Sequence, residues 1–141
     1  MAVLQYSIKE AFENLLEKSN EQFYNGNYHE SILLLEEAWD LIPNPKGIYC
    51  EESYDVVKDI ISTCFMIYDF KKAKEWADKI FTTGFARIDS GNKEFIAGTV
   101  YFELGDLEIA KEFFSIANEK SEGRCFWNPK NTKYLKFSKV K

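Results

Sequence analysis

The chemistry open to this chain is limited first by its single histidine, His29. No second histidine, cysteine pair or carboxylate stands beside it at the spacing of metal ligands, so we expect a surface residue and no metal site. Neither a Ser-His-Asp nor a Cys-His arrangement can be assembled without His29, and the sequence contains no GxSxG motif and no glycine-rich phosphate loop. We therefore expect a protein that is not an enzyme and that binds no cofactor.

The thiols and the paired acids also favour a structural interpretation. Cys50, Cys64 and Cys125 are an odd number with no close pairing, which fits a reducing cytoplasm. We expect Cys64 to be a small core residue of a helix. Acidic neighbours such as Glu36 and Glu37 do not share a helix face, so solvated surface is their ordinary interpretation.

The N-terminus and the hydropathy pattern indicate a cytoplasmic protein. The first residues, MAVLQYSIKEAF, lack a charged segment followed by an apolar run, so we expect no secretion signal. No stretch approaches the roughly 18 apolar residues of a membrane span, and we expect no membrane partner.

The net charge of −5 is unevenly distributed along the 141 residues. Residues 1–122 carry 12 Lys/Arg and 23 Asp/Glu, whereas residues 123–141 carry six Lys/Arg and no acid. An acidic body argues against nucleic-acid binding and favours a basic protein partner. We expect the basic tail to fold against its own acidic body rather than to bind phosphate.

The element that organises the chain is Gly98–Ala117, GTVYFELGDLEIAKEFFSIA, which we interpret as two helices joined by a tight turn. Gly105 stands in the turn, and the carboxylate of Asp106 can accept the free N–H groups of the next helix. The residues expected to face the first helix recur at i, i+4 and i+7: Ala110, Phe114 and Ala117. Small residues there let two antiparallel helices approach closely.

The same pattern occurs twice more, as Gly26-Asn27-Tyr28 and as Tyr68-Asp69-Phe70. The following residues at the helix spacing are Ser31, Leu35 and Ala38 in the first copy and Ala73, Ala77 and Ile80 in the second. Taking Gly26, Tyr68 and Gly105 as equivalent gives intervals of 42 and 37 residues. Intervals of this size indicate stacked repeats.

These copies resemble the tetratricopeptide repeat family. The second half-repeat of the family is similar to the segment GNYHESILLLEEAWDLIPNP, including Ala38 and Pro43. The family's small residue, aromatic residue, turn and two alanines are all matched in the segment GTVYFELGDLEIAKEFFSIA. The middle copy departs at Ile61, Cys64 and Ile80, and the intervals exceed the usual 34 residues. The resemblance covers roughly Phe12 to Asn118. It implies an all-α fold, a superhelix of about three antiparallel helix hairpins.

We expect a single domain over residues 1–141, with hairpins at about 7–43, 53–83 and 90–120 and a C-terminal cap at 123–141. The expected side-chain caps of the helices are Ser7, Asn27, Ser53, Asp69, Ser90 and Asp106. A stack of repeats leaves an apolar face open at its end, which a terminal segment must cover. The expected cover is Phe126, Trp127, Tyr134 and Phe137; the alternative is a tail that recruits another protein.

The resemblance also implies a binding groove lined by the first helix of each hairpin. The matching positions are Glu13, Leu16, Asn20, Phe23 and Tyr24 in copy one, Asp55, Lys58, Ser62, Phe65 and Met66 in copy two, and Asn92, Phe95, Thr99, Phe102 and Glu103 in copy three. Such a surface is aromatic with an acidic rim, which suits a protein partner. Phe23, Phe65 and Phe102 would either form one wall of the groove or pack between repeats. Of the positions that clamp a tail carboxylate in some family members, Asn20 alone fits.

Three functions stay open at this level. The first is a non-catalytic adaptor that binds a protein segment in the groove. The second is a bacterial immunity-type protein that masks a basic toxin, which a neighbouring toxin gene would favour. The third is a structural subunit that self-associates through exposed aromatic residues, which a strict monomer in light scattering would exclude. The oligomeric state does not follow from the sequence.

Overall fold

The structure is a computed structural model that describes residues 2–84 and 90–139. Over these residues it contains helices and no strand, which confirms the predicted all-α class. The α-helices are α1 (Tyr6–Tyr24), α2 (Tyr28–Leu41), α3 (Cys50–Met66), α4 (Phe70–Lys79), α5 (Asn92–Leu104), α6 (Leu107–Ser121) and α7 (Thr132–Ser138). Each copy of the repeated pattern therefore forms two helices, and α7 follows the last copy.

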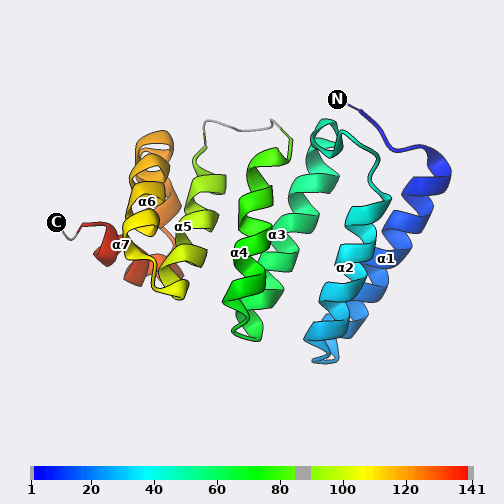
Figure 1. Cartoon of the computed structure of the whole chain (residues 1–141), viewed down its shortest axis with the longest axis horizontal. Coiled ribbons are helices and arrows are strands. Elements are labelled where there is room, and N and C mark those ends of the chain that lie inside the picture. Colours follow the sequence, from blue (N-terminus) through cyan, green and yellow to red (C-terminus); the bar gives the residue numbers. More distant parts are fainter. Residues whose placement is uncertain (1, 85–89, 140–141) are drawn as a thin grey trace. The chain divides into compact units, whose positions relative to one another are not determined.

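The chain forms two compact units, Met1–Ala86 and Arg87–Lys141. In the first unit α1 packs against α2, α3 packs against α4, and α2 also contacts α3. In the second unit α5 packs against α6, and the segment after α6 returns to this hairpin. Within each hairpin the two helices run in opposite directions (Figure 1). That residues 1–141 act as one domain stays a prediction.

The three turns inside the hairpins share one backbone feature, a residue in the left-handed region. The angle φ is +82° at Gly26, +57° at Tyr68 and +86° at Gly105. Glycine adopts this conformation freely, whereas it costs a residue with a side chain about 1–2 kcal/mol. The equivalence of the three turns is thus visible in the backbone, and Tyr68 is the strained member.

Small and apolar residues at the predicted spacing close each hairpin. The buried set is Ser31, Leu35, Ala38, Ala73, Ala77, Ile80, Ala110, Phe114 and Ala117. In the first hairpin the hydroxyls of Ser19 and Ser31 lie 2.7 Å apart, and each also donates to the other residue's carbonyl, at 2.9 and 3.0 Å. These bonds satisfy two buried hydroxyls and link α1 to α2.

The predicted helix caps have mixed outcomes. The carboxylate of Asp69 accepts a hydrogen bond from the backbone N–H of Lys72 at 3.1 Å, which confirms this cap. Asn27 and Asp106 stand at the N-cap positions of α2 and α6, but their side chains make no capping bond. Ser90 lies one residue before Gly91, the N-cap of α5, and its hydroxyl accepts a hydrogen bond from the Asn92 N–H at 3.3 Å. The side chain of Asn27 instead donates to Oε1 of Gln22 at 2.8 Å, which ties the turn to α1.

Two predicted caps are wrong because their helices begin earlier. Ser53 lies buried inside α3, and its hydroxyl donates to the carbonyl of Tyr49 at 2.8 Å. Ser7 likewise lies within the first turn of α1 and not before it. A serine hydroxyl can bond to the carbonyl four residues earlier, so it is satisfied inside a helix and does not by itself mark a boundary.

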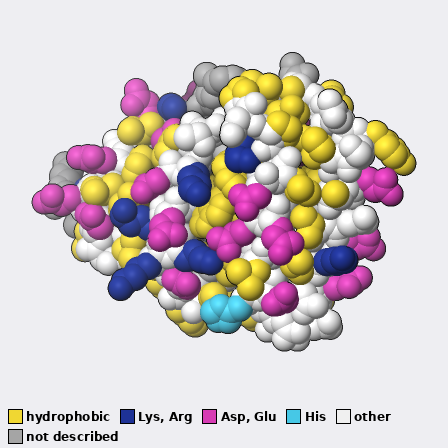
Figure 2. Space-filling view, turned by 45° about the vertical axis from the view of Figure 1, so that its right-hand side comes forward, with side chains coloured by type: hydrophobic (Ala, Val, Ile, Leu, Met, Phe, Trp, Pro, Cys, Tyr) yellow, Lys and Arg dark blue, Asp and Glu magenta, His cyan; other side chains and the backbone are white. Residues whose placement is uncertain are grey.

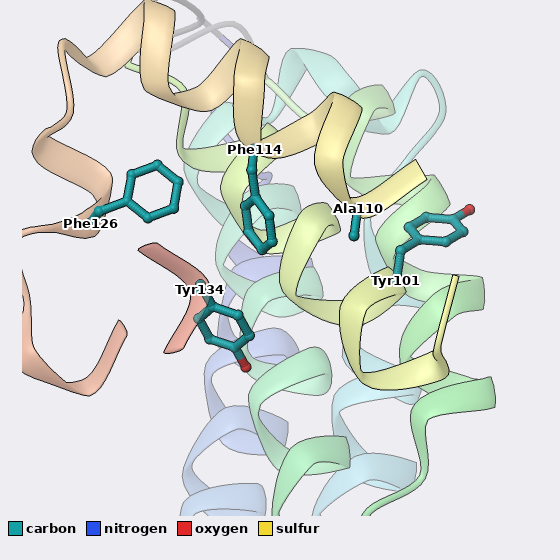
Figure 3. Packing of buried hydrophobic residues seen from close by; sticks show 5 residues of the cluster. All are labelled: Tyr101, Ala110, Phe114, Phe126 and Tyr134. Atoms are coloured by element: carbon teal, nitrogen blue, oxygen red, sulfur yellow. The ribbon is translucent and has the colours of Figure 1, made fainter. Parts of the chain in front are cut away.

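Phe114 of α6 forms the centre of an aromatic core in the second unit (Figure 3). Its side chain is fully buried. The rings around it, with centroids 5.6–6.1 Å away, are Phe95, Phe126, Tyr134 and Phe137. Gly98 of α5 faces the same ring, because a Cβ placed there would lie 2.7 Å from a carbon of Phe114. The absence of a side chain at Gly98 makes room for Phe114.

The residues after α6 cover this core, as predicted for the C-terminal segment. Phe126 and Tyr134 are buried, and the partly buried ring of Phe137 packs against the cluster. The predicted role of Trp127 in the cover is wrong, because its side chain is 73 % exposed. Trp127 directly follows Phe126 at the end of a 3₁₀ turn, where successive side chains point about 120° apart. Burying one of the two rings therefore turns the other to solvent.

Candidate functional site

A hollow of about 190 Å³ lies in the first unit, where α1, α2 and α3 meet. Its lining residues are Ser19, Asn20, Phe23, Tyr24, Ser31, Leu35, Asp59, Ser62 and Thr63. Helices α1 and α3 supply most of the lining, and the buried residues Ser31 and Leu35 of α2 form its floor. Four of the predicted partner-binding residues therefore meet in one place: Asn20, Phe23, Tyr24 and Ser62.

The aromatic side of the hollow is held by contacts around the first turn. The ring of Phe23 packs edge-on against Tyr28, with centroids 5.1 Å apart, and against Tyr24 at 5.9 Å. Phe23 is half-buried by these contacts, whereas Tyr24 is 85 % exposed. The hollow thus has one aromatic ring fixed by its neighbours and a second that is open to a partner.

The polar side of the hollow contains Asp59, which the sequence pattern did not single out. Within residues 2–84 no ion pair or hydrogen bond to its carboxylate occurs; its backbone carbonyl accepts a bond from the Thr63 hydroxyl at 2.8 Å. Asp59 is exposed, but partial desolvation by the surrounding protein raises the pKa of its carboxyl above its ordinary value, an effect that nearby Lys58 opposes and Asp55 reinforces. The hollow therefore presents a carboxylate that forms no direct ion pair with a side chain of residues 2–84.

The signal for Asp59 was present in the sequence. It lies one position after Lys58 and three before Ser62, so it is on the same broad face of α3 as the predicted groove residues. The groove residues were predicted from the positions that line the groove in the repeat family, and Asp59 does not stand at one of those positions. The structure includes it because α1 and α3 enclose the space between their facing sides.

The other predicted residues of the first unit are accessible but do not line this hollow. Glu13, Asp55 and Lys58 are exposed, Leu16 is half-buried, and Met66 is 50 % exposed. Phe65 is half-buried against Phe70, with centroids 5.1 Å apart, as Phe23 is against Tyr28. Phe23 and Phe65 thus each pack on the aromatic residue five positions later, across their own turn.

The predicted residues of the second unit mostly contact the chain itself. Thr99 is buried and its hydroxyl donates to the Ile96 carbonyl at 2.7 Å. Phe95 packs against Phe126 with centroids 5.2 Å apart, and against Tyr134 at 6.1 Å. Asn92 is exposed, and its side-chain oxygen accepts a long bond, 3.7 Å, from the thiol of Cys125.

The end of α5 holds side chains of the C-terminal segment directly. Phe102 packs edge-on against Tyr134 at 5.3 Å and against Phe137 at 5.0 Å. Glu103 accepts a hydrogen bond from the Tyr134 hydroxyl at 2.9 Å and forms an ion pair with Lys133. Burial and these contacts with Glu103 raise the pKa of Tyr134 above its ordinary value. The third copy's predicted binding surface is thus occupied by residues 133–137 of the same chain.

Among residues 2–84 and 90–139 no three His, Cys, Asp or Glu side chains meet in a way that could hold a metal ion. Cys64 is buried in α3, as predicted, and burial raises the pKa of its thiol to about 12. No helix in this described part is long and apolar enough to cross a membrane.

On the face that Figure 2 shows, the charged side chains do not form one patch of a single sign. Acidic and basic side chains are interspersed there with hydrophobic ones. The net charge differs between the two units. Residues 1–86 carry 8 Lys/Arg and 15 Asp/Glu, a net charge of −7, whereas residues 87–141 carry 10 and 8, a net charge of +2. The unit that contains the hollow is the strongly acidic one.

Comparison of the sequence with protein-family models and with curated proteins gives no match.

Proposed function

We propose that this chain is a tetratricopeptide-like helical repeat protein that binds a protein partner along the inner face of α1 and α3. The proposal is supported by the three equivalent turns, by the buried small residues of each hairpin and by the accessible residues on α1 and α3. A superhelix of such hairpins presents a concave surface, and repeat proteins of this kind bind other polypeptides.

The observation that carries the proposal is the hollow between α1 and α3. At about 190 Å³ it is smaller than the roughly 300–1,000 Å³ of small-molecule sites, so its size suits one side chain of a polypeptide. Beside it Tyr24 presents a largely exposed ring next to the fixed ring of Phe23. Aromatic anchors beside a small pocket are where protein interfaces concentrate their affinity.

The acidic character of the first unit favours a basic partner. Opposite charges raise the rate of encounter and select against acidic proteins. A toxin masked by an immunity-type protein is one such partner, and an adaptor's basic target segment is another. Both uses require the same surface.

The test is partner capture from cells that express the protein, quantified by mass spectrometry, with two matched tyrosine variants. Tyr24→Ala removes the exposed ring beside the hollow, and Tyr6→Ala removes a ring of nearly equal exposure, 81 % against 85 %, at the other end of α1. We expect Tyr24→Ala to reduce capture of the partner about tenfold, as for a hot-spot aromatic residue, with the melting temperature unchanged. Tyr6→Ala should leave capture intact.

Equal capture by the wild type and by both variants would refute the proposed surface. A self-associating subunit would give a different result, because the captured protein would then be the chain itself and light scattering would show an oligomer.

A further inference from the structure

The second unit shows how this chain binds a basic side chain. The ammonium of Lys133 pairs with the carboxylate of Glu103 and lies 5.9 Å from the ring centroid of Phe102 and 5.0 Å from that of Tyr134. A carboxylate and aromatic rings together bind a cation by charge and by the electron-rich ring faces. Phe102 and Glu103 stand at predicted groove positions of the third copy.

The hollow of the first unit offers the same groups without an occupant from the chain. Phe23 stands at the position equivalent to Phe102, and Tyr24 extends the aromatic side. The carboxylate comes from Asp59 across the hollow, and Asn20 and Ser62 add side-chain oxygens. Asp59 has no ion-pair partner within residues 2–84. The nearby ammonium of Lys58 lies instead over the ring of Tyr54, 5.9 Å from its centroid.

Charge selects the class of ligand. The unit carries a net charge of −7, and the Asp59 carboxylate, which has no ion-pair partner within residues 2–84, is more stable when a cation lies beside it. An acidic or apolar side chain in the hollow would leave that carboxylate unpaired, which costs binding free energy. A cation with a long apolar stem satisfies both the aromatic and the acidic side.

We propose that the hollow lined by Asn20, Phe23, Tyr24, Asp59 and Ser62 binds one arginine or lysine side chain of a basic partner segment. The cationic head pairs with the Asp59 carboxylate, and its stem lies along the rings of Phe23 and Tyr24. This inference rests on the proposed function and names the chemistry that the partner must supply.

The experiment is an NMR titration of the ¹⁵N-labelled full chain with a capped peptide, acetyl-Gly-Gly-Arg-Gly-Gly-amide. The matched control peptide replaces arginine with citrulline, which has nearly the same shape and no charge. We expect saturable shifts of the Asn20, Phe23 and Ser62 amides with the arginine peptide. The citrulline peptide should bind about tenfold more weakly, because it cannot form the charge pair with Asp59.

Two charge-matched variants test the role of the hollow. Asp59→Asn should weaken binding of the arginine peptide about tenfold, whereas Asp40→Asn, an exposed acid of α2 outside the lining, should change it less than about twofold. Equal losses in the two variants, shifts spread over the acidic surface, or no shift at the hollow at about 10 mM peptide would each overturn the inference.

The two proposals fail in different ways. If Tyr24→Ala abolishes partner capture but Asp59→Asn does not affect it, the protein-binding function stands and the cation site is refuted. If the arginine peptide binds in the hollow in an Asp59-dependent manner, the cation site stands even where Tyr24→Ala leaves capture unchanged.

Discussion

The contact between Gly98 and Phe114 provides a stringent test of how the second unit packs. A methyl group added at Gly98 would lie 2.7 Å from a ring carbon of Phe114, about 1 Å inside the usual 3.5–4.0 Å separation of two carbons. The ring cannot move away freely, because it is fully buried among Phe95, Phe126, Tyr134 and Phe137. Forcing an extra methyl group into such a core costs about 1–3 kcal/mol.

Helix propensity works in the opposite direction. Replacing glycine with alanine inside a helix such as α5 stabilises it by about 1 kcal/mol. The overpacking cost is the larger of the two, so we expect Gly98→Ala to lower the free energy of unfolding by about 1 kcal/mol. Phe114→Ala alone should lower it by about 3–5 kcal/mol, because it removes a buried ring and leaves a cavity.

The decisive quantity is the coupling between the two changes. In the Phe114→Ala background the clash is gone, so Gly98→Ala should raise the free energy of unfolding by about 1 kcal/mol. The expected coupling is about 2 kcal/mol, within the range of residues in direct contact.

Urea denaturation followed by circular dichroism measures the four proteins, and amide hydrogen exchange in α5 and α6 assigns the change to the second unit. If Gly98→Ala stabilises both backgrounds equally, the close approach of α5 and α6 at this point is refuted.

Two further predictions concern single side chains. Tyr68→Gly should raise the free energy of unfolding in urea by about 1 kcal/mol, because it relieves a left-handed φ of +57° at a ring that is 80 % exposed; a loss of stability would contradict the assigned strain. Tyr134→Phe should cost about 1 kcal/mol at pH 8 through its lost hydrogen bond. The pKa of Tyr134 is raised in the folded chain, so its contribution is present below the unfolded value of about 10 and is lost as pH rises above it. The stability difference between wild type and Tyr134→Phe should therefore shrink at pH 11, and an unchanged difference would contradict the buried contact with Glu103.

Much of the architecture follows from local patterns in the sequence. Apolar and small residues at the helix spacing predict the paired helices, and Ala110, Phe114 and Ala117 are all fully buried as expected. The turns are also readable, because Gly26 and Gly105 supply the left-handed backbone that ends a helix. These features depend on residues a few positions apart, so a short stretch of sequence is enough to predict them.

The beginnings of helices were less predictable for a physical reason. A serine hydroxyl serves equally as a cap or as an internal donor to the preceding turn, and Ser53 takes the second role. Which role is realised depends on whether the preceding residues, here from Cys50, gain enough by continuing the helix. That balance is decided by packing against other elements.

The sequence by itself determined an all-α chain of helix pairs joined by tight turns, because periodicity and turn chemistry act over a few residues. Tertiary structure alone decided which predicted binding positions stay open. It placed Asp59 across a hollow from Phe23, and it covered Phe102 and Glu103 with Lys133 and Tyr134. Contacts between residues some 30 positions apart depend on how whole helices pack, and no local spacing specifies them.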